Sequence, residues 1–458
     1  MLQVLVSSWA LLLGIGLLMV GNGLQATLMG VRGAIEGFST TELSIITSGY
    51  FAGFLFGSRL APEMIRRVGH VRVFAALGSF VSAALILFPV ITEPVTWTLL
   101  RVVIGFCFSG IYVTSESWLN NAATNETRGQ TLSAYMIVQM LGIISGQGLL
   151  GMGDPSGYVL FIVPSVLVSV SFAPILLSIT PTPPFQSTKP LGLRDLFRAS
   201  PLTFVGMTIL GGVFAAEFGM ASVFGTRIGL SVAEISAFVS AIFLGALVLQ
   251  YPIGWLSDRI DRRLLILGVA LIGGLAAIAG WLLAGFFPGL LAVGFLLGGT
   301  TNPLYSLLIA YLNDYLDPDD MAAASGGLIF VNGLGAITGP IITGWLMTVA
   351  GPDRGFWLFI AVLMLAIAGY AAYRMTQRPA PSVEEAAAYV AVAPTASQVA
   401  VEAAQEWALE HAEAEAGAED DPEPAEPGPA SAGESTQTDA AAAGERGARG
   451  EDGQPPRQ

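Results

Sequence analysis

The sequence predicts an all-α membrane protein whose twelve transmembrane helices form two pseudo-symmetric halves of six, with both termini in the cytoplasm. Three observations support this fold class: an apolar composition, long apolar runs along most of the chain, and a repeat between its halves. Hydrophobic residues make up 53% of the 458 residues, and only 12% are charged. Soluble globular proteins fall outside this balance, so the composition indicates a lipid environment.

Twelve apolar runs have the length that a membrane helix requires, because a hydrocarbon core of about 30 Å needs ~20 apolar residues. The runs are continuous and lack the alternation of a transmembrane barrel, which favours helices. The first run has no basic flank and exceeds a signal peptide's length, so we interpret it as retained. The runs cover residues 8–30, 43–62, 72–92, 97–119, 131–152, 157–179, 202–224, 233–255, 264–284, 288–311, 322–349 and 355–375.

Basic residues are distributed unevenly between alternate loops. With the N-terminus inside, the cytoplasmic loops and the segment after the last helix hold thirteen of them. The outside loops hold only Arg32, Arg227 and Arg354. This positive-inside asymmetry places both termini in the cytoplasm.

Local matches at a constant offset divide the chain into halves. The segments "GIISGQGLLG" (142–151) and "GAITGPIITG" (335–344) carry glycines at the same three positions, 193 residues apart. Such repeats suit a transporter whose halves move about a site near the bilayer midplane. The predicted domains are an N-terminal half at 1–180, a cytoplasmic linker at 181–200, a C-terminal half at 201–378 and a tail at 379–458.

The net charge of −14 resides in the tail, where residues 379–458 hold 3 basic and 17 acidic side chains. Because this segment is rich in Ala, Glu, Pro and Gly, we predict an acidic, disordered cytoplasmic tail. One stretch within it, "SQVAVEAAQEWALEHAEAEA", has the composition of a short helix. A solvated tail without specific function is the simpler interpretation, and a tail that docks a partner is the alternative.

One predicted helix carries a polar stripe. At 100° per residue, Arg101, Gly105, Ser109, Tyr112 and Glu116 fall within an arc of about 80°. Each charge would cost at least ~2.5–3.5 kcal/mol at the lipid centre, so the stripe is expected to line a wet cavity. We interpret Arg101 as a substrate or coupling residue, the alternative being an arginine that extends to the outer headgroups.

Glu116 lies near the cytoplasmic C-terminus of the same helix, where the helix dipole disfavours a carboxylate. It is therefore expected to pair with Arg67, Arg72 or Arg128. We interpret it as a gate residue, and a direct substrate ligand is the alternative.

Glu217 is the one carboxylate deep within any of the twelve runs, and intramembrane acids are functional candidates by default. Desolvation favours the neutral form of a carboxyl group, so Glu217 is predicted to exchange a proton. The alternative is a structural carboxylate neutralised by a neighbouring helix. The other candidate substrate or coupling residues are polar side chains of neighbouring runs, namely Asn22, Gln25, Tyr112, Asn302, Tyr305 and Tyr311.

Three motifs resemble those of the major facilitator superfamily, over about residues 8–375. "GWLSDRIDRR" (254–263) is similar to that family's loop motif G-x-x-x-D-R-x-G-R-R, and "RVVIG" (101–105) to its fourth-helix motif. The two glycine-rich segments resemble the fifth-helix motif, with Pro340 keeping its proline. The combination "SESWLN…RG" with "RRVGHVRVFAA" is most similar to a bacterial YcaD-like branch. The resemblance implies a cavity lined by helices 1, 4, 7 and 10.

The loop motif and the glycine segments have physical interpretations. The charged residues of the loop cluster are expected to form a cytoplasmic gate that holds the halves together in one state. The alternative is that these basic loops only set the membrane topology. The cluster comprises Asp258, Arg259, Arg262, Arg263 and Asp314. The glycine segments indicate close helix packing first and a hinge second. Their packing residues are Gly142, Gly146, Gly335, Gly339 and Pro340.

The sequence predicts a secondary transporter that moves a small organic solute by alternating access, coupled to protons. The alternatives are an uncoupled facilitator and a membrane-embedded sensor or enzyme with the same fold. The chain contains no ATP-binding loop motif, and its two histidines and single cysteine form no metal motif. We expect a multi-pass protein of a bacterial inner membrane, monomeric, with lipid, solute and protons as partners and without a cofactor, a metal or nucleic acid.

Overall fold

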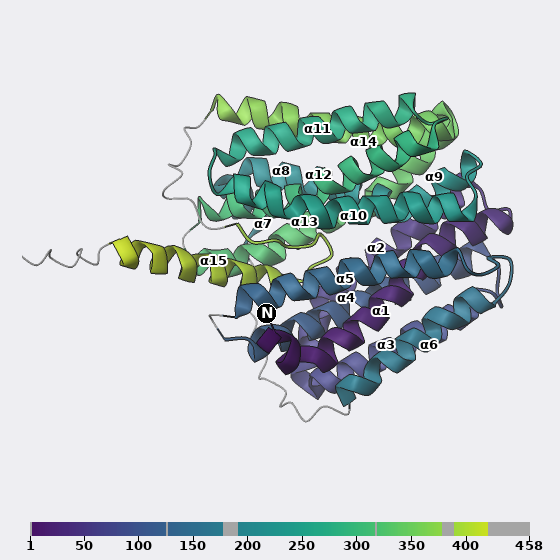
Figure 1. The fold of residues 1–458 in the computed structure, drawn as a ribbon, viewed down its shortest axis with the longest axis horizontal. Coiled ribbons are helices and arrows are strands. Elements are labelled where there is room, and N and C mark those ends of the chain that lie inside the picture. The colour runs from purple at the N-terminus through teal and green to yellow at the C-terminus, as the bar shows by residue number, and fades with distance from the viewer. Residues whose placement is uncertain (1, 125–126, 177–190, 317, 378–388, 420–458) are drawn as a thin grey trace, which may run out of the picture. The chain divides into compact units, whose positions relative to one another are not determined.

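The described chain is helical. The computed structural model describes residues 2–124, 127–176, 191–316, 318–377 and 389–419, and this part contains no β-strand (Figure 1). Residues 1–415 form one compact unit that holds both predicted halves, and residues 416–458 form a second unit. Residues 181–190 of the predicted linker, and residues 379–388 and 420–458 of the predicted tail, lie outside the described residues.

The helices follow the predicted order. In the first half, they are α1 (Leu2–Ile35), α2 (Thr40–Val68), α3 (His70–Leu87), α4 (Pro94–Ala122), α5 (Arg128–Leu150) and α6 (Val159–Leu176). The second half contains α8 (Pro201–Ala215), the π-helical turn η1 (Ala216–Met220), α9 (Ala221–Arg227), α10 (Val232–Ser257), α11 (Arg262–Leu282), α12 (Phe287–Asn313), α13 (Pro318–Ala350) and α14 (Pro352–Met375). Two helices stand outside the repeat, α7 (Leu193–Ala199) and α15 (Gln398–Glu419).

Ten helical segments among the described residues are long and apolar enough to cross a membrane. One of them is the continuous segment Pro201–Arg227, which joins α8, η1 and α9. The other two predicted runs fall in α2 and α6. The apolar part of α6 is shorter, and α2 mixes Ser, Thr, Gly and charged residues with its apolar ones.

The two halves use the same local signals. α2 and α10 both begin with a capping box, formed by Ser39 with Glu42 and by Ser231 with Glu234. In each box the serine hydroxyl accepts the glutamate's backbone N–H, and the carboxylate accepts the serine's N–H. Two orphan donors are thereby satisfied, which fixes where each helix starts.

Glycines at equivalent positions bring helices into backbone contact. A Cβ on Gly105 would lie 1.9 Å from the Tyr50 carbonyl oxygen, so α4 packs directly on α2. A Cβ on Gly298 would likewise lie 1.9 Å from the Ile242 carbonyl oxygen, and α12 packs directly on α10. The same close approach recurs for Gly142 and Gly146 against α1, and for Gly335 and Gly339 against α8.

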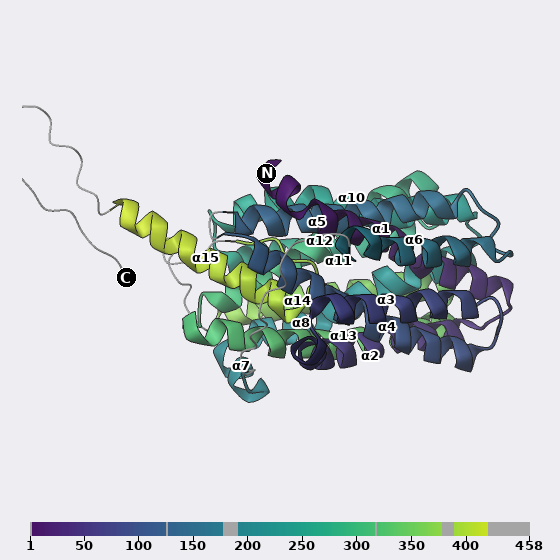
Figure 2. The same ribbon diagram turned by 90° about the horizontal axis from the view of Figure 1, so that it is seen from below.

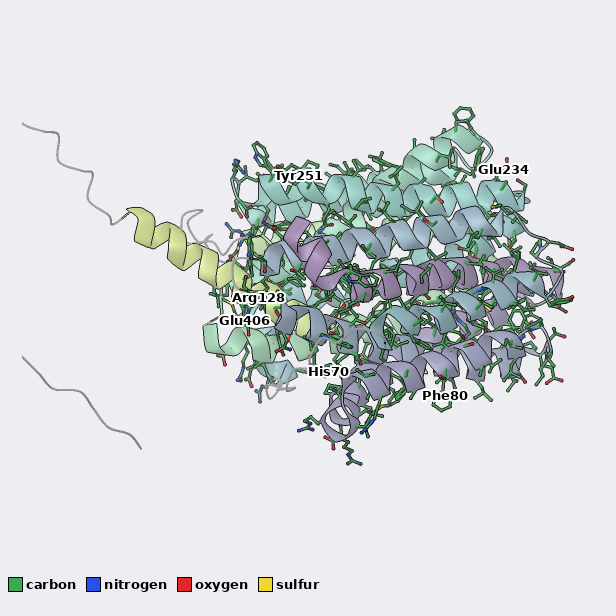
Figure 3. The ribbon with its side chains drawn as sticks, turned by 60° about the horizontal axis from the view of Figure 1, so that its bottom comes forward. His70, Phe80, Arg128, Glu234, Tyr251 and Glu406 are labelled. Carbon is green, nitrogen blue, oxygen red and sulfur yellow. The ribbon has the colours of Figure 1, made fainter. Side chains whose placement is uncertain are left out.

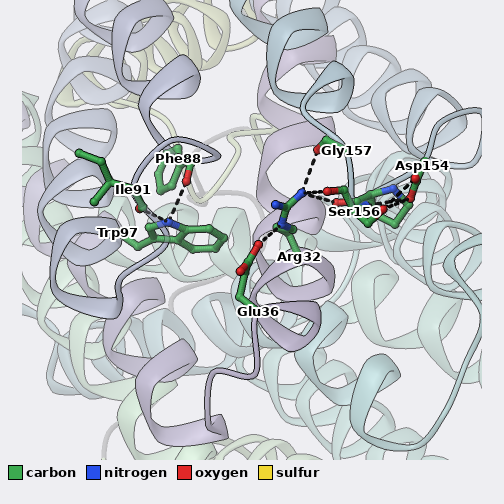
Figure 4. Close-up of polar contacts among 9 residues, drawn as sticks. Arg32, Glu36, Phe88, Ile91, Trp97, Asp154, Ser156 and Gly157 are labelled. Carbon is green, nitrogen blue, oxygen red and sulfur yellow. Dashed lines mark hydrogen bonds and ion pairs between the residues drawn. The ribbon is translucent and has the colours of Figure 1, made fainter.

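The two ends of the bundle differ. Both α15 and the N-terminus lie at one end, which we call the inner end (Figures 1 and 2). At the opposite, outer end, buried donors fix the turns (Figure 4). Arg32 donates to Glu36 at 2.6 Å and to three carbonyl groups of the α5–α6 connection. Trp97 Nε1 donates to the carbonyl groups of Phe88 at 3.1 Å and Ile91 at 3.0 Å.

The halves touch each other at the outer end. Arg227, at the end of α9, donates to the carbonyl group of Phe38 in the α1–α2 turn. The hydroxyl oxygen of Ser222 would lie 2.2 Å from a Cβ on Gly30 of α1, so α9 and α1 are in close contact. Ser48 of α2 donates to the Ile337 carbonyl group of α13 at 2.8 Å.

At the inner end the structure differs from the predicted solvated tail. Residues 389–409, which we call the C-terminal segment, pack against the transmembrane helices. Nine of its Ala and Val side chains are buried, namely Val392, Ala393, Ala396, Val399, Ala400, Val401, Ala403, Ala404 and Ala408. Composition indicated disorder because the acidic residues beyond 409 dominate it, whereas this stretch is mostly small and apolar.

Candidate functional site

A buried hydrogen-bonded ladder connects α1 with α4. Gln25 accepts from Arg101 at 2.9 Å and donates to Asn22 at 3.0 Å. Asn22 in turn donates to the Tyr112 hydroxyl at 3.4 Å, and that hydroxyl donates to the Met19 sulfur at 3.3 Å. Four side chains that the sequence analysis chose separately therefore form one network.

Arg101 is buried, with only 2% of its surface exposed, and it has a second contact besides Gln25. Its guanidinium carbon lies 4.5 Å from the centroid of the Tyr50 ring on α2, a cation–π geometry. Its Nε–H has no partner among the described residues. A buried guanidinium with a spare donor is suited to a carboxylate or another acceptor that enters the site.

Glu217 lies opposite this ladder in the second half, on the π-helical turn η1, and is 3% exposed. Thr301 of α12 donates to its Oε1 at 2.6 Å, while Oε2 has no partner among the described residues. Among the described residues, this carboxylate takes part in no ion pair. A π-helical turn inside an α-helix often marks a functional position.

Aromatic rings connect the surroundings of Arg101 with those of Glu217. Phe218, which follows Glu217, lies 6.0 Å from Tyr50 and 6.4 Å from Phe51 between ring centroids. Tyr50 is the ring over which Arg101 lies, so an aromatic contact links the two sites across the halves. Phe214 extends this layer and stacks on Phe218 at 5.8 Å.

Further buried polar atoms on α4, α9 and α12 have no partner in the described part of the chain. They are the Ser109 and Ser222 hydroxyls, the Asn302 Oδ1 and the Tyr305 hydroxyl. A buried polar group is costly to leave without a hydrogen-bond partner. Asn302 and Tyr305, which the sequence suggests as lining residues, are both buried on α12.

Tyr311 does not join this group. It lies ten residues after Thr301 on the same helix, which is about 15 Å along the axis. Its ring packs edge-on against Tyr315 at 5.1 Å, at the inner end of α12. The predicted lining residue thus belongs to the inner-end surroundings, because α12 extends well past the ladder.

Glu116 is 1% exposed, and its partners differ from those that the sequence analysis expected. Tyr135 of α5 donates to one carboxylate oxygen at 2.8 Å, and the backbone N–H of Ser397 donates to the other at 2.8 Å. The three candidate arginines are engaged elsewhere or lie apart. Arg67 pairs with Glu63 at 2.7 Å and Arg128 pairs with Glu406 at 2.9 Å. Arg72 forms no ion pair with any described residue.

The loop-motif charges form a cluster within the second half. Arg262 pairs with Asp314 and, at 3.6 Å, with Asp258, while Arg263 pairs with Asp261 at 2.9 Å. Arg259 lies over the Trp255 ring. Burial raises the pKa of Asp258, which accepts the backbone N–H of Tyr389 at 3.0 Å. These contacts join the cluster to the second half and to the C-terminal segment.

Sequence reasoning missed three parts of the site. Tyr50 and Thr301 are ordinary residues of apolar helices, so nothing distinguished them before their contacts with Arg101 and Glu217 were known. The C-terminal segment gave a weak signal, the short helical stretch within the tail. No group of three or more His, Cys, Asp or Glu side chains in the described chain is placed to hold a metal ion.

Sequence comparisons connect the chain with transporters. The family model described as Major Facilitator Superfamily matches residues 11–236 and 202–409. The MFS-type transporter YfkF of Bacillus subtilis is 28% identical over 329 residues, which cover 69% of this chain and 81% of YfkF. The MFS-type transporter YcaD of Escherichia fergusonii is 26% identical over 344 residues, covering 74% of this chain and 88% of YcaD.

Solved transporters share the fold. The crystal structure of the nucleoside transporter NupG matches with a TM-score of 0.66 at 16% identity, covering 81% of this chain and 100% of that one. A bacterial homologue of the human lysosomal transporter Spinster, in an inward-facing and unoccupied conformation, matches with a TM-score of 0.63 at 16% identity. That match covers 88% of this chain and 98% of the homologue.

Proposed function

The chain belongs to the Major Facilitator Superfamily, and on this premise we propose that it moves a small organic solute across the membrane by proton-coupled alternating access. Twelve membrane-spanning helices, cytoplasmic termini and a bacterial inner membrane complete the proposal. The inner end, with the basic loops, then faces the cytoplasm.

The observation that carries the proposal is the environment of Glu217. It is a buried carboxylate that accepts from one hydroxyl group and has no ion pair among the described residues, on the segment that touches both halves. A carboxyl group in such surroundings prefers to be neutral, and it ionises when water or a cation reaches it. Movement of the halves would change that access, which is the physical basis for coupling proton transfer to transport.

The ladder on α1 and α4 supports an acceptor-bearing solute. Arg101 is charged, pre-oriented by Gln25 and Tyr50, and retains a free Nε–H. Its planar fork is suited to carboxylate or phosphate groups. We therefore propose an organic anion, or an amphipathic solute with an anionic group, as the substrate class.

The test is gradient-driven accumulation in proteoliposomes, with candidate solutes found by comparing metabolites in vesicles with and without the protein. Glu217→Gln mimics the protonated carboxyl, so we expect exchange of labelled for unlabelled solute to persist. Accumulation under an imposed pH gradient should fall at least tenfold, because net proton movement is lost.

Glu93→Gln is the matched control. Glu93 is an exposed carboxylate at the start of α4 whose side chain makes no capping hydrogen bond. The Glu93→Gln variant should accumulate solute to the same level as the unmodified protein. Wild-type accumulation by Glu217→Gln would remove this residue from coupling and leave the proposed mechanism without its proton site.

A further inference from the structure

The C-terminal segment carries polar contacts to both halves at once. Toward the first half, the Ser397 N–H donates to Glu116 of α4, and Glu406 pairs with Arg128 of α5. Figure 3 shows Glu406 of α15 beside Arg128. The ring of Trp407 also lies against α5, 2.7 Å from the place of a Cβ on Gly129. These contacts span the start of α15 and its third turn.

Toward the second half, the segment is hydrogen-bonded to α10, α12 and α13. The Gln250 side chain of α10 donates to the Tyr389 hydroxyl at 2.8 Å. Ser306 of α12 accepts the Val392 N–H at 2.9 Å and donates to the Val392 carbonyl at 3.0 Å. In addition, Gln405 donates to the Asn313 side chain of α12 at 2.8 Å, and Ser325 of α13 donates to Glu402 at 3.3 Å.

Its apolar residues fill the space between the halves. Pro394, Thr395 and Ala396 line one pocket with residues of α2 and α13, and Ala393 and Ala400 line another with residues of α4 and α5. Ser397 and Gln405 are each only 2% exposed, and each has a partner on a transmembrane helix. Hydrogen bonds from both residues to transmembrane helices, with small apolar side chains packed around them, indicate a fitted contact.

We propose that the C-terminal segment is an autoinhibitory closure, which covers the inner opening between the halves and holds them in the conformation that is closed at the outer end. The inference rests on the proposed alternating access. An inserted helical turn keeps the inner ends of α5 and α10–α13 apart, whereas opening the outer end requires them to approach. Transport therefore requires release of residues 389–409.

The test uses two thiol probes in the full-length Cys107→Ala protein and needs no substrate. Ala336→Cys is buried in the pocket beneath Thr395 and Ala396 and reports the inner opening. Ser222→Cys is buried at the contact of α9 with α1 and reports the outer end. Reactivity is measured with a small, charged methanethiosulfonate reagent added from either side of reconstituted vesicles.

Release is produced in two independent ways. Ala400→Trp places a ring where a fully buried methyl group packs, and Ser397→Pro deletes the N–H that Glu116 accepts. Gln398→Trp is the matched control, since Gln398 is partly exposed and its side chain forms no hydrogen bond with the described residues. We expect each release variant to raise labelling of both probes at least tenfold, and the control to change neither.

Two results would overturn the inference. If both release variants leave Ala336→Cys unreactive, the segment does not cover the opening. If Ala336→Cys reacts but Ser222→Cys does not, the segment covers the opening without holding the conformation. Arg227→Ala, which removes the outer contact to Phe38, separates this failure from that of alternating access. Only when Ser222→Cys also stays unreactive in Arg227→Ala does alternating access itself fail.

Discussion

At the scale of single residues, the site is defined by two ionisable side chains, Arg101 and Glu217, that need polar partners which lipid does not offer. Arg101 is stabilised by the Gln25 carboxamide and the Tyr50 ring, and it forms no ion pair with the described residues. Glu217 has a single hydroxyl partner. Neutral partners leave both ionisable groups able to respond to an arriving ion or solute, whereas a tight ion pair would fix them as charges.

Gln25 is predicted to be the residue that keeps Arg101 in place. Gln25→Leu removes the acceptor of the guanidinium and leaves a buried charge short of a partner. Losing a hydrogen bond to a charged group costs about 1.5–3 kcal/mol, so thermal unfolding in detergent should shift clearly downward. Gln377→Leu, at an exposed position, serves as the control. Equal unfolding temperatures for the two variants would contradict the ladder's structural role.

Glu402 is predicted to make docking of the C-terminal segment depend on pH. Burial raises its pKa from 4.5 to about 7; the Ser325 hydroxyl opposes this rise, and the Glu406 carboxylate, itself paired with Arg128, adds to it. Because the docked state holds the proton more tightly, docking is strongest below about pH 4.5. Docking weakens as the pH rises, and the stabilisation that protonated Glu402 gives to the docked state is lost as the pH passes through about 7.

The corresponding measurement is the labelling rate of Ala336→Cys between about pH 6 and pH 8, relative to an exposed thiol at Gln377→Cys. The ratio should rise several-fold with pH, and Glu402→Gln should abolish the rise because the group no longer titrates. A rise that persists in Glu402→Gln would assign the pH dependence to another group.

At the scale of elements, glycine spacing decides which helices pair. α5 packs on α1 and α13 on α8 through glycines that occupy equivalent positions in the repeat. Small residues let backbones approach closely in membranes, where no hydrophobic force drives helices together. The same spacing therefore produces the same pairing in both halves.

Gly335→Val is predicted to separate α13 from α8. A Cβ there would lie 1.8 Å from the Thr208 carbonyl oxygen, a backbone atom that cannot move without the helix. Overpacking typically costs about 1–3 kcal/mol, so the folded fraction in size-exclusion chromatography should drop. Gly369→Val is the control, because a Cβ on Gly369 meets no atom within 4 Å. Similar folded fractions for both variants would argue against the close contact.

At the scale of the whole molecule, the arrangement is asymmetric although the halves repeat. The outer end is joined by direct contacts between α1 or α2 and α9 or α13. The inner end is bridged by residues from beyond the repeat. Under the proposed closure, a segment outside the two halves selects the conformation that they adopt.

Topology is tested by labelling from each side in the Cys107→Ala protein. Thr376→Cys, exposed just after α14, should react only from the cytoplasmic side. Glu234→Cys, in the first turn of α10 at the end away from α15, should react only from outside (Figure 3). The opposite pattern would invert the proposed orientation.

The sequence by itself predicted the helical membrane fold and the family, and it singled out the main candidates for the site. Apolar length and glycine spacing are local properties, and Arg101, Glu217, Asn22 and Gln25 stand out because lipid cannot accommodate charged and amide groups cheaply. Those residues were therefore identifiable without knowing any contact.

Only the tertiary structure decided which groups meet. Tyr50 and Thr301 cost nothing in an apolar helix, so their roles emerge only from the packing of α2 on α4 and of α12 on η1. Glu116 faces Tyr135 and Ser397 because a segment 281 residues further along the chain packs at the inner end of the bundle. Burial of that segment depends on surfaces from both halves, and such non-local complementarity leaves no periodic pattern in the sequence.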